Sequence, residues 1–226
     1  MMIRVELHCH TYHSIDSLML PEQILKTIDQ KGIDRIAITD HNSIEGALEL
    51  ASLAPDRIIV GEEIKTTEGE LIGYFIKESI PKNLSSMEAI KALRDQKAFI
   101  SVPHPFDQER SNHWEEERLE EISHLIDAIE VFNSRTLTHG PNRMAKDFAA
   151  RHNLLETAGS DAHTTGEIGR TTITCPTFED AESMRQAIAQ GEIHAKRSRL
   201  WVYFSSARAV YKKSKGWEPP PSDSLD

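Results

Sequence analysis

Residues 3–10 alternate between apolar and polar side chains, a pattern that predicts a strand with two unlike faces. The apolar face carries Ile3, Val5, Leu7 and Cys9. The opposite face carries Glu6, His8 and His10, because alternate side chains of a strand point to opposite sides. Two imidazoles on one face of a rigid strand are typical ligands of a divalent metal ion, but such a pair alone is equally typical of histidines that bind no metal.

Farther along the chain, short apolar runs alternate with amphipathic segments that predict helices. Pro21 opens the first helix and Gly32 ends it, and Ser85 with Glu88 forms a capping box at the start of another. The further strands are predicted at 35–39, 57–61, 71–76, 98–102, 128–132, 155–158, 171–174 and 193–195. The helices are predicted at 21–31, 43–54, 85–96, 114–125, 141–152, 177–189 and 200–213.

This alternation predicts parallel strands joined by right-handed crossovers. About seven such units in some 200 residues favour closure into an α/β barrel over an open sheet. We expect a single domain over residues 1–215, including the last helix, and a tail over 216–226 with three consecutive prolines. The apolar side chains of the last helix either close the barrel or form a dimer contact, and the sequence leaves the oligomeric state open.

Composition narrows the classes of function. With 38% hydrophobic and 27% charged residues in 226, the chain is an ordinary globular protein, and its net charge of −10 argues against a clamp for long nucleic acid. Cys9 and Cys175 are too far apart in sequence to suggest a disulfide framework and fit a reducing compartment. Because we see neither a membrane span nor a signal peptide, we expect a cytoplasmic protein without a membrane partner.

Residues that commonly bind metals end six of the first seven predicted strands. They are His8 and His10, Asp40 and His41, Glu62 and Glu63, His104, Glu130 and Asn133, and Asp161 and His163. In a closed parallel barrel these strand ends form one rim, where active sites are built. Imidazoles and carboxylates with almost no thiolate suit zinc, iron(II) or manganese, and a glutamate can bridge two ions. Two neighbouring ions suit displacement at phosphorus.

The four motifs at these strand ends resemble, in order and spacing, those of the polymerase and histidinol phosphatase (PHP) family of metal-dependent phosphoesterases. They are His8-Cys9-His10, Thr39-Asp40-His41-Asn42, Pro103-His104-Pro105 and Gly159-Ser160-Asp161-Ala162-His163. The resemblance covers roughly residues 1–195. It implies a distorted seven-stranded (β/α)7 TIM-like barrel with two or three divalent ions (Zn, Mn or Fe) at the rim.

The resemblance also implies which residues hold the ions. By the resemblance, the first ion is held by His8, His10, Glu63 and Asp161. The second is held by His104 with a bridging Glu63, and the third by Asp16, His41 and His163. Glu63 is preferred to Glu62 because the carboxylate of the family follows a glycine by two positions, as Glu63 follows Gly61.

Two positions depart from the family pattern. Glu6 stands where many members have aspartate, and residues 70–73 offer no histidine where many members have a ligand of the second ion. Glu130 is a candidate to replace that missing ligand.

Three further residues are candidates for catalysis. Asp40 is expected to orient a ligand and not to bind metal itself, because its neighbour His41 is a predicted ligand and adjacent residues seldom both point inward. Arg135 and His139 follow a strand, where they either contact a phosphate oxygen or the leaving group or lie in an exposed loop. The basic run after His194 is more typical of solvated charge than of phosphate recognition.

The predicted reaction is hydrolysis of a phosphate ester. A metal-bridging hydroxide attacks phosphorus in line, the ions and an arginine stabilise the developing charge, and water or His139 protonates the leaving oxygen. A small phosphomonoester or a nucleotide is the expected substrate, and the same mechanism permits trimming of short oligonucleotide ends.

Two alternatives remain. An amidohydrolase-like metal hydrolase also begins with His-x-His but typically has a bridging lysine or a solitary strand-end aspartate, whereas His104 and the Asp161-x-His163 pair favour phosphoester chemistry. The other alternative is an accessory module that binds metal without turnover.

Overall fold

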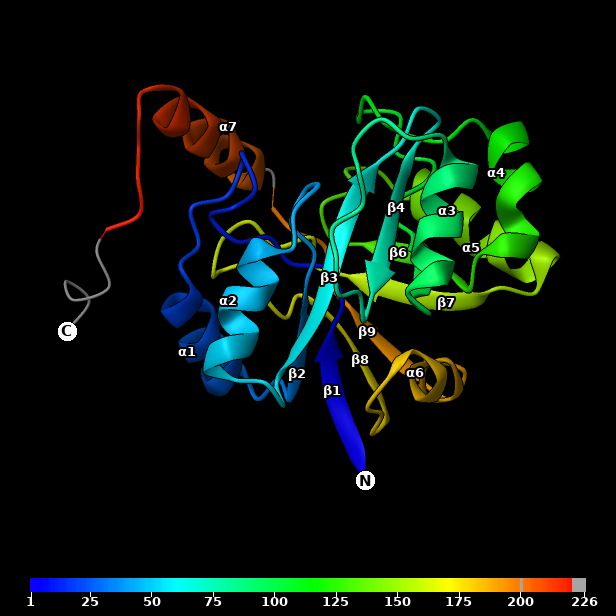
Figure 1. Ribbon diagram of the computed structural model, residues 1–226, viewed down its shortest axis with the longest axis horizontal. Coiled ribbons are helices and arrows are strands. Elements are labelled where there is room, and N and C mark those ends of the chain that lie inside the picture. Colours follow the sequence, from blue (N-terminus) through cyan, green and yellow to red (C-terminus); the bar gives the residue numbers. More distant parts are fainter. Residues whose placement is uncertain (200, 221–226) are drawn as a thin grey trace.

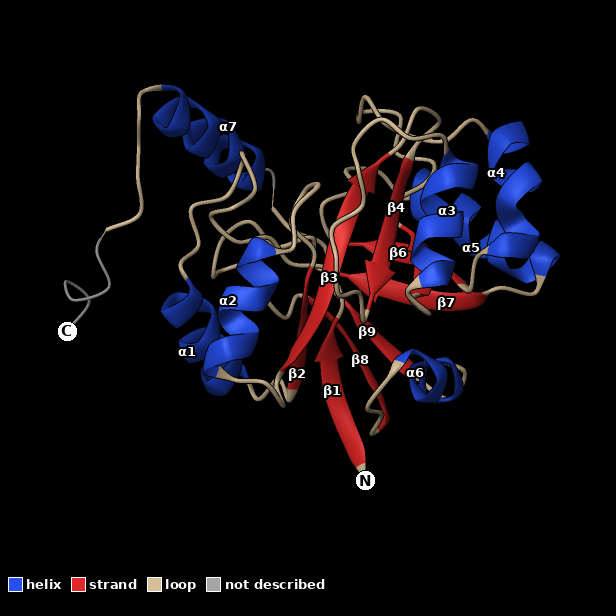
Figure 2. Ribbon diagram, in the orientation of Figure 1, coloured by secondary structure: helices blue, strands red, loops and turns tan. Residues whose placement is uncertain are grey.

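The computed structural model describes residues 1–199 and 201–220, and within them one sheet is surrounded by helices (Figures 1 and 2). The strands are β1 (Met2–Glu6), β2 (Arg35–Ile38), β3 (Ile58–Lys65), β4 (Glu70–Tyr74), β5 (Phe99–Val102), β6 (Ala128–Asn133), β7 (Leu155–Gly159), β8 (Thr171–Pro176) and β9 (Glu192–Ala195). The helices are α1 (Pro21–Lys31), α2 (Glu45–Leu53), α3 (Ser86–Asp95), α4 (Glu116–Ile122), the 3-10 turn η1 (Ser123–Leu125), α5 (Gly140–His152), α6 (Ala181–Ile188) and α7 (Trp201–Ser214). Leu200, expected to begin the last helix, and 221–226 of the expected tail lie outside the described residues.

The sheet is nearly closed into a barrel. Its strand order is β7-β6-β5-β4-β3-β2-β1-β8-β9. Beyond the end of β1, the amide of His10 donates to the carbonyl of Ala162 over 2.9 Å, and the amide of Ala162 donates to the carbonyl of His8 over 3.1 Å. These bonds join the chain after β1 to the chain after β7. The α/β class and the barrel-like sheet are therefore confirmed, but the described residues form nine strands instead of seven. Strands β8 and β9, which are connected through α6, extend the sheet beyond β1.

The expectation of parallel pairing throughout is wrong. Four neighbouring pairs are parallel, but β4 is antiparallel to both β3 and β5, and β8 is antiparallel to both β1 and β9. Residues 66–69 link β3 to β4, and so short a link permits a hairpin but no crossover. Because β4 runs in the opposite direction, its first residue, Glu70, lies at the rim where β3 ends.

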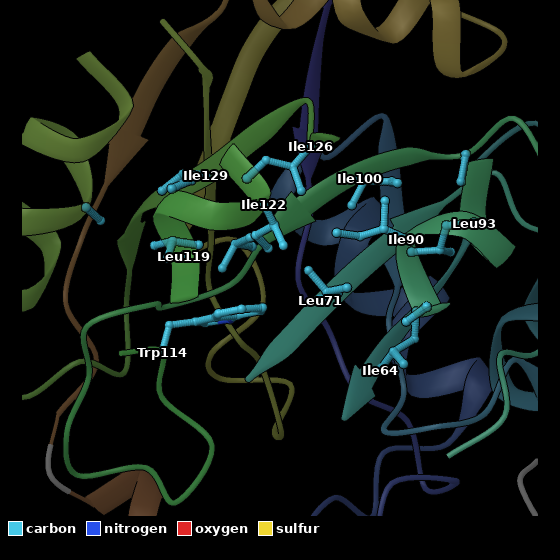
Figure 3. Packing of buried hydrophobic residues seen from close by; sticks show 14 of the residues in the cluster. Ile64, Leu71, Ile90, Leu93, Ile100, Trp114, Leu119, Ile122, Ile126 and Ile129 are labelled. Carbon is cyan, nitrogen blue, oxygen red and sulfur yellow. The ribbon is translucent and has the colours of Figure 1, made fainter. Parts of the chain in front are cut away.

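Trp114 holds the β3–β4 hairpin in place. It is buried with Ile64 and Leu71 in one apolar cluster (Figure 3). Its indole Nε1 donates to the carbonyl of Glu70 over 2.9 Å, and its ring packs so closely on Gly69 that a Cβ there would come within 2.3 Å of Trp114 Cε2. The indole therefore fixes the turn that carries Glu70.

Helix α7 lies over the loops that follow β1 and β2 (Figure 1). It is tied to the barrel by polar contacts. Lys213 Nζ donates to the carbonyls of Tyr12 and Ser14, and Arg135 Nη2 donates to the carbonyl of Val202 over 2.9 Å. None of the helices in the described part of the chain has the length and apolar character required to cross a membrane.

We expect Trp114→Ala to lower the free energy of unfolding by about 3–5 kcal/mol, because it removes a large buried ring and leaves the turn uncovered. Trp114→Phe should cost less, since it loses mainly the bond to Glu70. Urea unfolding followed by circular dichroism measures both. Trp201→Ala is the control, because that side chain is 74% exposed. An equal loss in Trp114→Ala and Trp201→Ala would contradict the packing role.

Candidate metal centre

Four ligand-type atoms converge at the rim without a hydrogen-bond partner among the described residues: Nε2 of His8, Nε2 of His10, Oε2 of Glu63 and Oδ1 of Asp161. The Nε2 atoms of His8 and His10 each lie 3.4 Å from Glu63 Oε2. They lie 3.7 and 3.3 Å, respectively, from Asp161 Oδ1. All four residues are buried.

The hydrogen bonds of the two histidines fix which ring nitrogen is free. His8 Nδ1 lies 3.0 Å from Glu130 Oε1, a carboxylate that can only accept when ionised, so this nitrogen carries the proton. His10 Nδ1 lies 3.1 Å from Ser14 Oγ, whose own proton is donated to Asp40 Oδ1 over 2.6 Å. When both imidazoles are neutral, their Nε2 atoms present lone pairs toward the carboxylates, and four acceptors face one another. Burial acts to lower the pKa of His8, but Asp161, Glu130 and Glu63 raise it well above its usual range, so without an ion His8 takes up a proton that a bound ion would replace.

A divalent cation among these four atoms would satisfy them all. Buried acceptors that face one another without a donor are strongly destabilising, unless a cation lies among them. Ligands about 2.1 Å from a tetrahedral ion are about 3.4 Å apart, which agrees with the measured 3.3–3.7 Å. The four residues thus fit a divalent ion, in the grouping that the sequence analysis expected.

Asp40 and Glu130 lie behind the ligand-type residues. Asp40 accepts from the amide of Thr11 over 2.7 Å and from Ser14 Oγ, and so supports His10 indirectly. Glu130 Oε2 accepts from the amide of His104 over 2.9 Å, while its other oxygen holds His8. Such partners fix the orientation of ligand imidazoles.

A second group of ligand-type atoms surrounds the other oxygen of Glu63. Its Oε1 lies 2.9 Å from His104 Nε2, and Glu70 Oε2 lies 4.0 Å from the same nitrogen. Atoms of His41, Glu63 and Glu70 fall within 4.8 Å of one another. Burial raises the pKa of Glu70, and the nearby Glu63 raises it further. A bound cation would offset both effects.

Glu70 is a site residue that was not predicted from the sequence. The family pattern places a histidine within residues 70–73, and rim residues were expected only at the last positions of strands. The carboxylate at residue 70 was visible in the sequence, but the antiparallel direction of β4, which brings it to the rim, was not.

A third group opens toward solvent. Atoms of His10, His41 and His163 fall within 4.8 Å of one another. Asp16 Oδ2 lies 2.9 Å from His163 Nε2, and Asp16 Oδ1 lies 3.7 Å from His41 Nε2. The side chains of His41 and Asp16 are 26% and 23% exposed. This is the accessible side of the centre.

The charges of the cluster keep its central carboxylates ionised. Burial acts to raise the pKa of Glu63, but His8 and His41 hold it well below its usual range. Burial acts likewise on Asp161, whose pKa is held well below its usual range by Arg110 and His8. The pKa of His10 is lowered to about 3 by burial and by the neighbouring His163 and His41.

Arg110 is a second residue that the sequence analysis missed. Its Nη2 donates to Asp161 Oδ2, and its Nε lies 3.5 Å from Asp107 Oδ2. It belongs to the irregular loop between β5 and α4, whose local sequence pattern does not identify a site residue. The guanidinium brings a fixed positive charge to the edge of the centre.

Arg135 and His139, both predicted to act in catalysis, lie in different surroundings. Arg135 is 5% exposed, and its Nη1 lies 2.6 Å from His163 Nδ1. Its Nη2 donates to the carbonyl of Val202 and to Ser206 Oγ of α7, each over 2.9 Å. His139 is exposed at the start of α5, outside the buried cluster.

Two residues of undecided role point away from the centre. Glu62 accepts from Ser79 Oγ over 2.6 Å and from the amide of Ile80 over 2.9 Å, and so faces the side opposite to Glu63. His194 is exposed on β9, where its Nε2 lies 3.0 Å from Thr174 Oγ1.

A cavity of about 500 Å³ adjoins the centre at His163. It lies between the segment leading into α1 and helix α7, and its wall includes Gln23, Phe204 and Arg208. A group attached to a ligand at the centre can extend into it.

The chain is similar to known proteins in both sequence and fold. A family model described as PHP-associated matches residues 139–193. An uncharacterized protein of Methanocaldococcus jannaschii is 38% identical over 172 residues, which cover 74% of this chain and 68% of that protein. A 5'-3' exoribonuclease of Haemophilus influenzae is 30% identical over 102 residues, which cover 42% of this chain and 37% of that protein.

A solved structure from Bacteroides vulgatus, a two-domain protein containing a predicted PHP-like metal-dependent phosphoesterase, has a similar fold. The TM-score is 0.71 at 19% identity, and the match covers 92% of this chain and 70% of that chain. At this level of identity the likeness concerns the fold.

We expect manganese to raise the stability of the wild type by about 2.7 kcal/mol when the ion is present at a hundred times its dissociation constant. Glu63→Gln should lose most of this gain, because the amide offers one weakly ligating oxygen in place of a shared carboxylate. Thermal unfolding with and without the ion measures the difference. Glu62→Gln is the matched control and should keep the gain. An unchanged gain in Glu63→Gln would contradict the shared-ligand role.

Glu70→Ala should lower the number of ions bound per chain by about one, because it removes a carboxylate from the second group. Elemental analysis of protein dialysed against manganese or zinc gives this number. The exposed Glu78, just beyond β4, supplies the control variant Glu78→Ala. Equal ion content in the two variants would remove Glu70 from the centre.

Proposed function

Because the chain belongs to the PHP family, we propose that it is a metal-dependent phosphoesterase that hydrolyses a small phosphate monoester or a nucleotide. One observation carries this proposal: the four unpartnered ligand atoms of His8, His10, Glu63 and Asp161 lie 3.3–3.7 Å apart across their histidine–carboxylate pairs. Groups with further ligand-type atoms adjoin them on two sides, as a site for more than one ion requires.

Three sets of residues would hold two or three ions of zinc, manganese or iron. The sets are His8, His10, Glu63 and Asp161; His104 and Glu70 with Glu63; and Asp16, His41 and His163. When bound, such ions lower the pKa of water and neutralise charge on the phosphoryl group. The side chains of these three sets supply the ligand atoms, and the hydrogen bonds of Asp40 and Glu130 fix the orientation of the ligand imidazoles.

The residues of the chain itself would bind and orient the substrate. The Arg110 side chain is 24% exposed at the edge of the centre and can donate to the oxygens of the phosphoryl group. Arg135 is proposed as a positioning residue, because it contacts His163 and α7 and is almost wholly buried. Since His139 lies outside the cluster, a water molecule is better placed than this imidazole to protonate the leaving oxygen.

The cavity beside His163 favours a nucleoside or another planar leaving group. Phe204 offers a face for stacking, and Arg208 and Gln23 offer donors. The partial relationship to an exoribonuclease supports the second candidate, removal of nucleotides from short oligonucleotide ends. The net charge of −10 disfavours long nucleic acid as the partner.

The test is release of phosphate from a panel of nucleotides and sugar phosphates by protein loaded with manganese, iron(II) or zinc. His10→Ala should lower kcat/KM at least about a hundredfold, because it removes an ion ligand. His13→Ala should leave kcat/KM unchanged, since His13 lies at the surface near Glu49. Phosphate release by His10→Ala equal to that of the wild type would refute the role of the centre. Absence of turnover by the loaded wild type would refute the activity.

A further inference from the structure

Lys213, near the end of α7, contacts the loop that follows β1 (Figure 1). Its Nζ donates to the carbonyls of Tyr12 and Ser14. Trp217 packs against the same group, because its ring centre lies 5.9 Å from Lys213 Nζ and 6.5 Å from the ring centre of Tyr12. Two carbonyl oxygens that converge on one point are unfavourable unless a donor lies between them, and an ammonium can donate to both. The conformation of this loop therefore depends on Lys213.

The loop that Lys213 holds, residues 11–17, supports the metal centre through Ser14. Ser14 is buried, and its Oγ lies 3.1 Å from His10 Nδ1. The same Oγ accepts from the amide of His41 over 3.1 Å. Ser14 thus joins Lys213, through its carbonyl, to two ligand-type histidines, through its hydroxyl. A shift of this one residue would disturb both imidazoles.

The same loop presents Asp16 to the accessible side of the centre. Asp16 Oδ2 lies 2.9 Å from His163 Nε2. The carbonyl of Ser14, which accepts from Lys213, also accepts from the amide of Ser17 over 3.2 Å. The acceptor that Lys213 holds is therefore part of the turn around Asp16. Displacement of that carbonyl would move the Asp16 carboxylate relative to His163.

Lys213 is one of several separate anchors of α7. Val202 and Ala209 are the buried residues of the described part of this helix. At the start of the helix, Arg135 donates to the carbonyl of Val202 over 2.9 Å. Loss of the Lys213 contacts would therefore release the loop and the end of α7 while the start of the helix stays attached. The effect of Lys213 on the loop can thus be separated from its effect on the fold.

We propose that Lys213 is a positioning residue of the metal centre. By holding residues 11–17, it fixes the imidazoles that Ser14 supports and the carboxylate of Asp16. It acts through the loop and not as a ligand, and such partners commonly govern ion affinity by about 10- to 100-fold. The accessible group of ligands, to which Asp16 belongs, should depend on Lys213 most. The inference rests on the proposed function only where turnover is measured.

The first test is the binding of manganese by the whole chain after treatment with a chelator, measured by calorimetric titration. Lys213→Met removes the donors while keeping a long side chain, and it should weaken the most weakly bound ion at least about tenfold. Lys215→Met is the matched control, because Lys215 is exposed just beyond the end of α7, and it should bind manganese as the wild type does. Equal binding by the two variants, or no binding by the wild type, would overturn the proposal.

A rescue variant separates the donated bonds from the bulk of the side chain. Lys213→Arg keeps the charge and the donors and should restore part of the affinity that Lys213→Met loses. Affinity in Lys213→Arg no better than in Lys213→Met would overturn the role assigned to these bonds. If Lys213→Met fails to fold by circular dichroism, Lys213→Gln takes its place with the same expected loss.

The second test follows the loop itself in the metal-free chain. Lys213→Met should speed hydrogen exchange of the amides in residues 11–17 at least about tenfold, because the loop opens more often. Mass spectrometry of peptides measures this rate, and Lys215→Met should leave it unchanged. Peptides from α5 should exchange equally in all variants. Equal protection of the loop in both variants, or faster exchange of α5 as well, would overturn a role confined to positioning.

The third test uses turnover of a phosphate ester that the wild type hydrolyses. The kcat/KM of Lys213→Met should be low at limiting manganese and approach that of the wild type as manganese is raised, because excess ion offsets weak binding. A deficit that excess manganese leaves in place would overturn the positioning role. If the wild type hydrolyses no member of the panel, the proposed function fails, whereas ion binding and hydrogen exchange still decide the role of Lys213.

Discussion

The Glu63 carboxylate is the point on which the rest of the site depends. Its Oε2 faces His8 and His10 at 3.4 Å and His41 at 3.0 Å, and its Oε1 faces His104 at 2.9 Å. So many polar side chains around one buried carboxylate would be unfavourable in a core built for stability alone. Their geometry is that of a shell of ligands, and the hydrogen bonds behind them hold that shell together.

Closure of the barrel and construction of the centre use the same backbone. The bonds between Ala162 and the residues His8 and His10 join the chain after β1 to the chain after β7. The same two residues contribute imidazoles, and Asp161 precedes Ala162 directly. Gly159, just before, packs so closely on His8 that a Cβ at residue 159 would lie 2.3 Å from His8 Cβ. The hydrogen bonds that close the barrel between Ala162 and residues 8 and 10 therefore also fix the positions of the ligand side chains.

Sequence reasoning anticipated the parts of the site that local periodicity and strand ends determine. The alternation around His8 and His10 predicted their common face. The choice of Glu63 over Glu62 came from the resemblance to the family, whose carboxylate follows a glycine by two positions, and Glu63 points to the centre while Glu62 points to Ser79. The direction of β4 was not predictable from alternation, so Glu70 was missed. Arg110 was missed because its position depends on how the loop between β5 and α4 packs on the rim, which only long-range packing determines.

Arg135 joins the candidate metal centre to helix α7, since its guanidinium contacts His163 Nδ1 and donates to the carbonyl of Val202 and to Ser206 Oγ. Where ion binding beside His163 and docking of α7 favour the same position of this guanidinium, the two events share a coupling free energy, and such coupling is reciprocal. By that linkage, loss of the contacts between Arg135 and α7 lowers the affinity for the ion by the same factor as loss of the ion lowers the stability of α7 docking, so the last helix takes part in assembling the centre.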